Sequence, residues 1–303
     1  MSQDTLTRDS RADAPTDWTA KPPPQLTARR AKNVAMTVLL GLVMALTVAV
    51  LAWVLGYVAL EGLRYLGPEF LLNTPPGNPS QAGGGFVNGI IGSFIVVGIA
   101  TVISVPLGIA AAIFIVEYNG RLARTVSFLT DVLVGIPTIV TGAFIYALWV
   151  IHFGFSGLAG AIALALVMLP LIIRTTAEML RLVPDPLREA SLALGVTRAR
   201  TITSVVLPTA GSGIVTGVML AVARAMGETA PLLLTALGND LFVETNPTQR
   251  MSTLSLQIFG NAITGFKAAQ ARAWAGALTL IALVLIFTLI ARLISRRGTT
   301  PGR

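Results

Sequence analysis

The 303-residue sequence contains no cysteine, a single histidine and few charged residues. Without cysteine, the chain has no disulfide framework, no thiolate metal site and no cysteine nucleophile. The single histidine, His152, cannot build a zinc site without cysteines or a nearby cluster of acidic residues. Charged residues make up only 12% of the chain, about half their usual share in soluble domains. These absences argue against thiol and zinc chemistry and against a water-soluble fold.

The sequence also lacks the short motifs of hydrolytic and nucleotide-binding sites. It contains no Gly-x-Ser-x-Gly, no His-Glu-x-x-His and no P-loop. We therefore expect a protein that is not an enzyme and has no cofactor of its own. If its function uses ATP, another chain must hydrolyse it.

Long apolar runs are the dominant feature that is present. Hydrophobic residues make up 54% of the chain, and the mean hydropathy is +0.76. Crossing a bilayer core of about 30 Å takes roughly 20 helical residues, and continuous rather than alternating runs favour helices over a strand barrel. We predict an all-α polytopic membrane protein with a transmembrane domain over 33–298 and six transmembrane helices at about residues 34–60, 86–116, 126–151, 156–177, 202–237 and 273–292.

The positions of lysine and arginine predict the orientation of these helices. If the N-terminus is cytoplasmic, 17 of the 22 basic residues fall in segments on the cytoplasmic side. This bias is the positive-inside pattern of membrane proteins, and it predicts that both termini are cytoplasmic. It also accounts for the net charge of +8 without nucleic-acid binding. The polar residues 1–32 are predicted to form a disordered cytoplasmic tail.

A short amphipathic helix is predicted in the cytoplasmic loop 178–201. Asp185 is suited to cap it, Pro186 to occupy its first position, and Gly195 to end it in the left-handed conformation. Four arginines surround this helix. From local physics alone, it either lies on the membrane surface or docks into a partner.

Two opposite charges lie in the fifth apolar run. Arg224 and Glu228 are four residues apart, so they can pair on one helix face, and each costs about 2.5–3.5 kcal/mol in a span centre. One interpretation is a structural pair that neutralises itself. The other is an anion site, because a guanidinium donates paired N–H bonds to phosphate oxygens. We take Arg224, Glu228 and the adjacent Thr229 as candidate pathway residues. Asp131, near one end of the third run, is expected to lie near Arg121 or Arg124.

The cytoplasmic loop resembles the signature of ABC importer permeases. Glu189 and Ala190 are followed at the family's spacing by Gly195 and by an aliphatic-x-Leu-Pro segment at 205–208. The chain departs from the pattern at Ser191, where the family has alanine, and has valine rather than isoleucine at the aliphatic position. The resemblance implies the type I ABC importer permease fold. It also implies that Glu189, Ala190 and Gly195 couple the chain to an ATPase subunit.

Three further segments resemble the PstA-type permeases of bacterial phosphate importers more closely than ABC permeases at large. They are residues 106–118, 135–142 and 223–231. The resemblance implies a phosphate transport role in the bacterial inner membrane, in contact with lipid. The implied partners are a paralogous PstC-like permease, a cytoplasmic PstB-like ATPase dimer and a periplasmic PstS-like phosphate-binding protein. A PstC-type subunit, or a permease for sulfate, molybdate or phosphonate, remains an alternative at this point.

Overall fold

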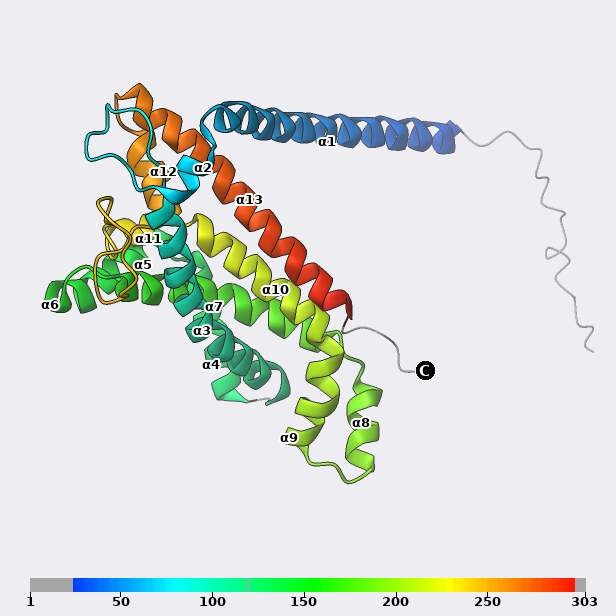
Figure 1. Cartoon of the computed structure of the whole chain (residues 1–303). Coiled ribbons are helices and arrows are strands. Elements are labelled where there is room, and N and C mark those ends of the chain that lie inside the picture. Colours follow the sequence, from blue (N-terminus) through cyan, green and yellow to red (C-terminus); the bar gives the residue numbers. More distant parts are fainter. Residues whose placement is uncertain (1–23, 119, 298–303) are drawn as a thin grey trace, which may run out of the picture. The chain divides into compact units, whose positions relative to one another are not determined.

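The computed structural model describes residues 24–118 and 120–297, and nearly all of the described chain is helical. Within these residues there is no β-strand, and a single bridge joins Leu237 to Met251. The chain divides at Gly56 into two units. The structure thus confirms the predicted all-α class (Figure 1).

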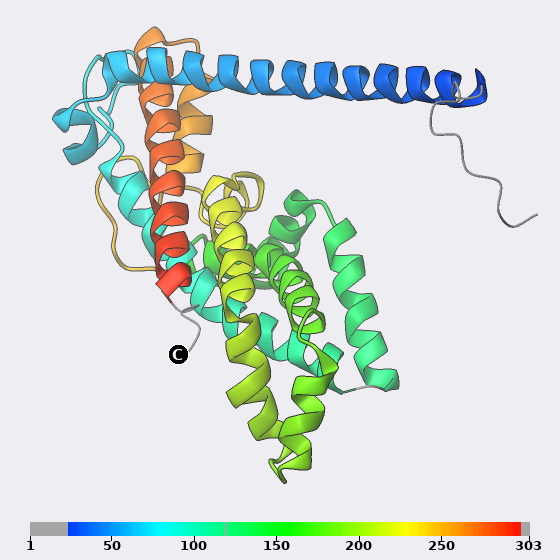
Figure 2. The same ribbon diagram turned by 90° about the vertical axis from the view of Figure 1, so that its right-hand side faces the viewer.

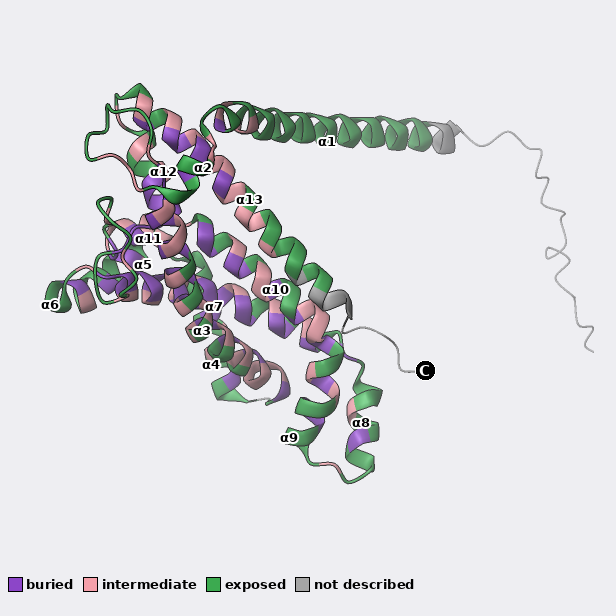
Figure 3. Ribbon diagram, in the orientation of Figure 1, coloured by how far each residue is buried: buried purple, intermediate pink, exposed green. Residues whose placement is uncertain are grey.

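The described residues of the first unit, 24–56, all belong to one apolar helix, which continues into the second unit. Helix α1 spans Pro24–Tyr65, and its side chains from 28 to 56 are exposed within the unit (Figure 3). A long apolar helix with no buried side chain needs lipid or another protein around it. Residues 1–23 of the tail expected to be disordered lie outside the described residues. Residues 24–32 of that tail are helical.

The core of the second unit is formed by α3 (Val87–Glu117), α7 (Gly157–Arg181) and α10 (Leu207–Gly227). Small side chains on the facing surfaces let these helices approach closely. Adding a Cβ at Gly108 of α3, for example, would bring it within 2.6 Å of Ile172 in α7. The buried cluster shared by the three helices is Val96, Val97, Ala100, Ala161, Leu164, Ala165, Met168, Ile172, Ala221, Val222, Ala225 and Met226.

Two helices and a helical hairpin lie at opposite ends of this core. Helices α2 (Pro68–Leu72) and α12 (Leu254–Ala262) are at one end, and α12 packs against α13 (Lys267–Arg297). Helices α8 (Asp185–Ala193) and α9 (Arg198–Thr201) form a hairpin at the other end, as both ribbon views show (Figures 1 and 2). This arrangement separates the predicted outer loops from the predicted coupling loop.

The third predicted span is broken in the structure. Helix α4 (Arg121–Gly135) and the segment Thr138–Phe153 meet at an angle of 103°. That segment comprises α5 (Thr138–Ile145), the π-turn Tyr146–Val150 and α6 (Ile151–Phe153). The bend is at Pro137, which lacks an N–H and holds the preceding Ile136 in an extended conformation. Within the described residues, five helices are long and apolar enough to cross a membrane, or six if this bent pair is one span.

The fifth predicted span, expected over 202–237, is also modified at both ends. The π-turn Ile202–Val206 joins α9 to α10 in one continuous helical stretch. Pro208 explains the wider turn, because it cannot donate to the carbonyl four residues earlier and its ring crowds that carbonyl. The stretch ends at Gly227, before the short α11 (Ala230–Leu233). The helix is thus interrupted beside Arg224.

Candidate functional site

Arg224 and Glu228 form an ion pair where α10 ends. The distance from Arg224 Nε to Glu228 Oε1 is 3.2 Å. Glu228 has left the helix, with extended backbone angles of −74° and 124°. The side chain of Arg224 is 59% exposed and that of Glu228 is 16% exposed. The predicted pairing is therefore present, with the guanidinium open to an approaching group and the carboxylate mostly covered.

Neighbouring segments fix the peptide that carries Glu228. The Ser255 hydroxyl, in α12, donates to the carbonyl oxygen of Glu228 at 3.1 Å. Thr229 begins α11, and its carbonyl accepts from the backbone N–H groups of Leu232 and Leu233. The break between α10 and α11 is thus a hydrogen-bonded junction connected to α12.

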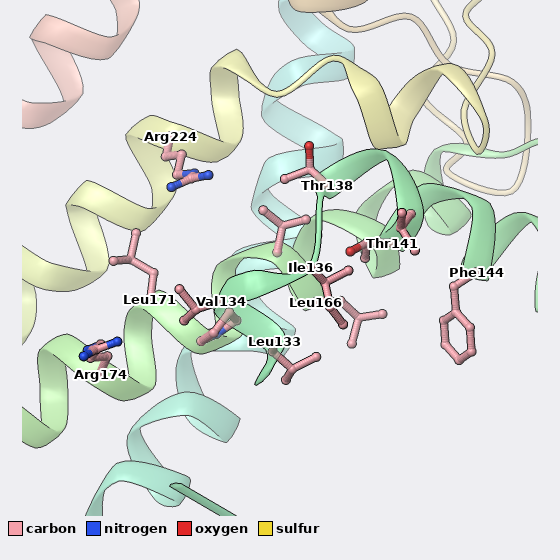
Figure 4. Close-up of a pocket in the computed structure, with 13 residues that line it drawn as sticks. Leu133, Val134, Ile136, Thr138, Thr141, Phe144, Leu166, Leu171, Arg174 and Arg224 are labelled. Atoms are coloured by element: carbon pink, nitrogen blue, oxygen red, sulfur yellow. The ribbon is translucent and has the colours of Figure 1, made fainter. Parts of the chain in front are cut away.

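A cavity of about 390 Å³ lies beside Arg224, between α10, α7, α5 and the end of α4. Its wall is apolar except for Thr138, Thr141 and two arginines, Arg174 and Arg224. Figure 4 shows these arginines projecting from neighbouring helices. Glu228 and Thr229 are not among the described residues that line the cavity. The complete lining is Leu133, Val134, Ile136, Thr138, Val140, Thr141, Phe144, Leu166, Val167, Pro170, Leu171, Arg174 and Arg224.

Arg174 lines this cavity but was not among the candidate residues predicted from the sequence. It follows the fourth apolar run directly, so it was interpreted only as a topology signal. In the structure its Nη1 is 3.7 Å from Asp131 Oδ1 and its Nε is 3.8 Å from Glu178 Oε1. The expectation that Asp131 lies near Arg121 or Arg124 is not met, since its ion pair is with Arg174. An acidic residue in one apolar run and a basic residue at the edge of the next were the available signal.

The pairs around Arg174 are loose enough to be replaced by a ligand. Both exceed the usual length of a charge-assisted hydrogen bond, and the side chains of Arg174 and Asp131 are 58% and 61% exposed. Exposed pairs of this kind contribute about 0–1 kcal/mol. The donors of Arg174 are therefore not committed to strong internal bonds.

A smaller polar hollow of about 160 Å³ continues from Arg174 along α7. Arg181 follows Arg174 by seven residues, so it lies on the same helix face two turns further on. The hollow also contains Ser127, Thr130 and Asp131 of α4. Polar and basic groups therefore extend from the apolar cavity toward the end of α7 that the sequence predicts to be cytoplasmic.

The predicted cytoplasmic helix is present as α8, with the predicted ending. Gly195 has φ +78°, its N–H donates to Leu192 O at 2.9 Å, and the N–H of Val196 donates to Ser191 O at 3.3 Å. These two bonds form the Schellman motif that closes a helix C-terminus. Glu189 and Ala190 are exposed on α8, where a partner can reach them.

The start of α8 differs from the prediction by one position. Pro184 is the N-cap, Asp185 is the first helical residue and Pro186 the second. The carboxylate of Asp185 makes no capping bond and instead accepts from Arg188 Nη1 at 3.1 Å. Arg188 is one of the four arginines predicted to surround the helix, but its side chain is only 16% exposed.

The sequence of this chain is similar to that of known membrane transport proteins. Residues 104–299 match the family described as "Binding-protein-dependent transport system inner membrane component". The chain is 43% identical over 270 residues to the phosphate transport system permease protein PstA of Yersinia pestis, covering 88% of this chain and 90% of that protein. It is 42% identical to PstA 1 of Mycobacterium tuberculosis over 233 residues, 74% of each chain.

Solved structures show the same fold at low sequence identity. A bacterial alginate ABC transporter in complex with its alginate-bound periplasmic protein gives a TM-score of 0.64 at 15% identity, covering 90% of this chain and 99% of that chain. An inward-facing structure of the MetNI methionine ABC transporter gives 0.56 at 21% identity, covering 71% and 94%. By the length of the family match and the identity to its relatives, this chain belongs to the family of binding-protein-dependent transport system inner membrane components.

Proposed function

We propose that this chain is the PstA-type permease subunit of an ATP-driven phosphate importer. The observation that carries the proposal is the placement of Arg174 and Arg224, from two core helices, on one cavity in a membrane-spanning unit. The naming of its relatives as phosphate transport system permease proteins supports phosphate as the substrate.

The cavity is suited to a tetrahedral oxyanion. A guanidinium offers several N–H donors in a planar fork that matches phosphate oxygens, and the apolar wall strengthens this attraction by excluding water. With no substrate present, Glu228 holds Arg224 in place. When phosphate enters, it takes up the exposed donors of Arg224. The hydroxyls of Thr138 and Thr141 lie on the same cavity as acceptors or donors for a protonated phosphate oxygen.

Movement of the anion is driven from the cytoplasmic hairpin. We assign Glu189, Ala190 and Gly195 to the contact with an ATPase subunit, because Glu189 and Ala190 are exposed and Gly195 shapes the turn after them. The stretch Arg198–Gly227 then runs through one π-turn to Arg224. A displacement of the hairpin therefore reaches the cavity along a single helical stretch.

In the proposed assembly, partner subunits provide the second half of the pathway, the ATPase activity and the delivery of phosphate. A paralogous PstC-like permease completes the pathway, a PstB-like ATPase dimer hydrolyses ATP, and a PstS-like periplasmic protein delivers phosphate. The chain is expected to reside in the bacterial inner membrane. The absence of a P-loop from the sequence requires ATP hydrolysis on a partner.

ATP-dependent uptake into proteoliposomes tests the proposal. We would reconstitute the chain with the two other membrane-complex subunits and phosphate-loaded binding protein, and follow radiolabelled phosphate with ATP supplied to the ATPase side. We expect uptake that requires ATP and is insensitive to a protonophore. Competition by sulfate or molybdate with equal potency would contradict phosphate selectivity. Uptake abolished by the protonophore would contradict an ATP-driven importer.

A further inference from the structure

Arg188 points from α8 into the protein and joins the ends of two core helices. Its Nε and Nη2 are both 3.2 Å from Glu117 Oε1, at the end of α3. Its Nη2 also donates to Leu180 O at 2.7 Å, and its Nη1 donates to Val183 O. One side chain of α8 therefore contacts the carboxylate that ends α3, a carbonyl in the last turn of α7 and a carbonyl in the linker that follows α7.

The local chemistry explains why these groups stay together. Glu117 is the last residue of α3 and is only 6% exposed, and a carboxylate is unfavourable at a helix C-terminus. The carbonyl of Leu180 also accepts from the backbone N–H of Val183 at 3.3 Å, and Val183 lies just beyond the end of α7. Arg188 supplies positive charge to the carboxylate and further N–H donors to the two carbonyls, so its removal leaves the buried Glu117 carboxylate without its ion-pair partner.

A second contact reaches the same end of α3 from the other arm of the hairpin. The guanidinium carbon of Arg198, at the start of α9, lies 5.6 Å from the ring centroid of Tyr118. The two arms are tied to each other by Ser191 and Thr201, whose hydroxyl oxygens are 2.9 Å apart and buried. The hairpin is thus held as one piece against Glu117 and Tyr118.

We propose that Glu117 and Arg188 form a clamp that transmits movement of α8 to α3 and α7. This inference rests on the proposed function, in which α8 contacts an ATPase subunit. Apart from the clamp, α8 is joined to α7 by the short linker 182–184 and packs against α9 and the π-turn Ile202–Val206. With the clamp, α8 cannot shift without moving the ends of both core helices.

The route from the clamp to the substrate site runs through packed helices. Ala112 of α3 and Ile173, Ala177 and Leu180 of α7 share a buried cluster just above the clamp. Arg174, which lines the cavity, lies between two members of that cluster. Force applied to α8 therefore reaches one of the two cavity arginines through α7, in addition to the route through α10 to Arg224. Glu117 and Arg188 are positioning residues in this scheme, because neither lines the cavity.

The stoichiometry of transport tests the clamp. We would measure phosphate uptake and ATP hydrolysis together in the reconstituted complex for the unaltered chain, Glu117→Gln, Arg188→Lys and the double variant. Glu117→Gln keeps the shape but removes the charge, and Arg188→Lys keeps the charge but removes the planar fork. Arg124→Gln is the matched control, because the exposed Arg124 side chain makes no ion pair among the described residues.

The expected result is uncoupling. Each single variant should assemble and hydrolyse ATP at a rate within twofold of the unaltered chain, while phosphate transported per ATP falls at least fivefold. The double variant should lose no more than the worse single variant, since both changes break the contact between Glu117 and Arg188. An unchanged ratio of phosphate to ATP in both single variants would overturn the clamp. A complex of the unaltered chain that shows no ATP-dependent uptake would instead overturn the proposed function.

A distance measurement gives a readout that does not depend on transport. The chain has no native cysteine, so spin labels can be attached at Leu107→Cys in α3 and Leu192→Cys in α8, both exposed positions. With the clamp intact, we expect one narrow distance distribution with and without ATP bound to the complex. Adding Glu117→Gln should broaden it and make it shift on ATP binding. Identical distributions with Glu and Gln at 117 would overturn the clamp.

Discussion

Arg174 of α7 and Arg224 of α10 line the same cavity although fifty residues separate them in the chain. Each arginine also forms an ion pair with an acidic residue four positions later in the sequence: Arg174 with Glu178 and Arg224 with Glu228. Both arginines therefore combine a place on the cavity with a carboxylate partner four residues later, although Glu228 lies beyond the end of α10 and Glu178 lies within α7. This relationship makes Arg174 as much a part of the proposed pathway as Arg224.

Replacing Arg174 with glutamine is the first prediction. The change removes one of two positive charges on the cavity while leaving the helix intact, since Arg174 makes only long ion pairs. We expect phosphate uptake by the reconstituted complex to fall at least tenfold, with assembly unchanged. Arg124→Gln removes a basic residue from α4 that does not line the cavity, and should retain uptake. Equal uptake by both variants would show that Arg174 is not on the pathway.

Gly142 is predicted to be needed for the contact between α5 and α11. A Cβ at this position would lie 2.6 Å from Pro231 Cα and 2.9 Å from its carbonyl oxygen. Gly142→Ala must push α11 away from α5, and overpacking of this kind typically costs about 1–3 kcal/mol. We expect a lower melting temperature of the purified complex and reduced uptake, because α11 begins directly after the junction that carries Glu228.

Gly135→Ala is the matched control for that substitution. Gly135 ends α4, and a Cβ there would meet no atom within 4 Å. The same chemical change a few residues away should therefore leave the melting temperature within about a degree of the unaltered complex. If Gly135→Ala lowered the melting temperature as much as Gly142→Ala, close contact with Pro231 would not be the reason.

Gly195 is predicted to tolerate asparagine better than alanine. Its φ of +78° is in the left-handed region, which costs other residues about 1–3 kcal/mol and asparagine less than most. A Cβ there would meet nothing within 4 Å, so backbone strain is the only cost. We expect Gly195→Ala to weaken binding of the ATPase subunit measurably, and Gly195→Asn to weaken it less. Binding measured by co-purification over a salt series would show the order, and a reversed order would contradict this turn as the cause.

In the hairpin of α8 and α9, local sequence signals predict the end of a helix but not the position of Arg188. The end of α8 at Gly195 follows from one residue and its backbone conformation, so it was predictable without tertiary contacts. The inward turn of Arg188 was not, because it depends on Glu117, which is 71 residues away in the chain. Exposure of an arginine on an amphipathic helix is the local expectation, and only the meeting of three helix ends reverses it.

For the cavity too, local sequence spacing predicts some contacts but not those that depend on distant residues. The pair of Arg224 and Glu228 was predictable because helical spacing alone brings residues four apart together. The role of Arg174 was hidden because a charge at the edge of an apolar run is also what topology requires. A proline inside the third run indicates a bend, but the size of the bend at Pro137, 103°, was not predictable from the sequence. A proline within an apolar run is often tolerated in a membrane helix, so its effect depends on the neighbouring helices.

Phosphate uptake by Arg224→Gln is the most direct test of the account. The complex carrying this substitution would be reconstituted with its partner subunits, its assembly checked by size-exclusion chromatography, and ATP-dependent uptake compared with that of the unaltered complex. Glutamine cannot supply the charge or the fork of donors that phosphate requires, so we predict intact assembly and uptake reduced at least a hundredfold. Uptake at the unaltered rate would contradict the assignment of the arginine-lined cavity as the phosphate pathway and leave Arg224 and Glu228 as a structural pair.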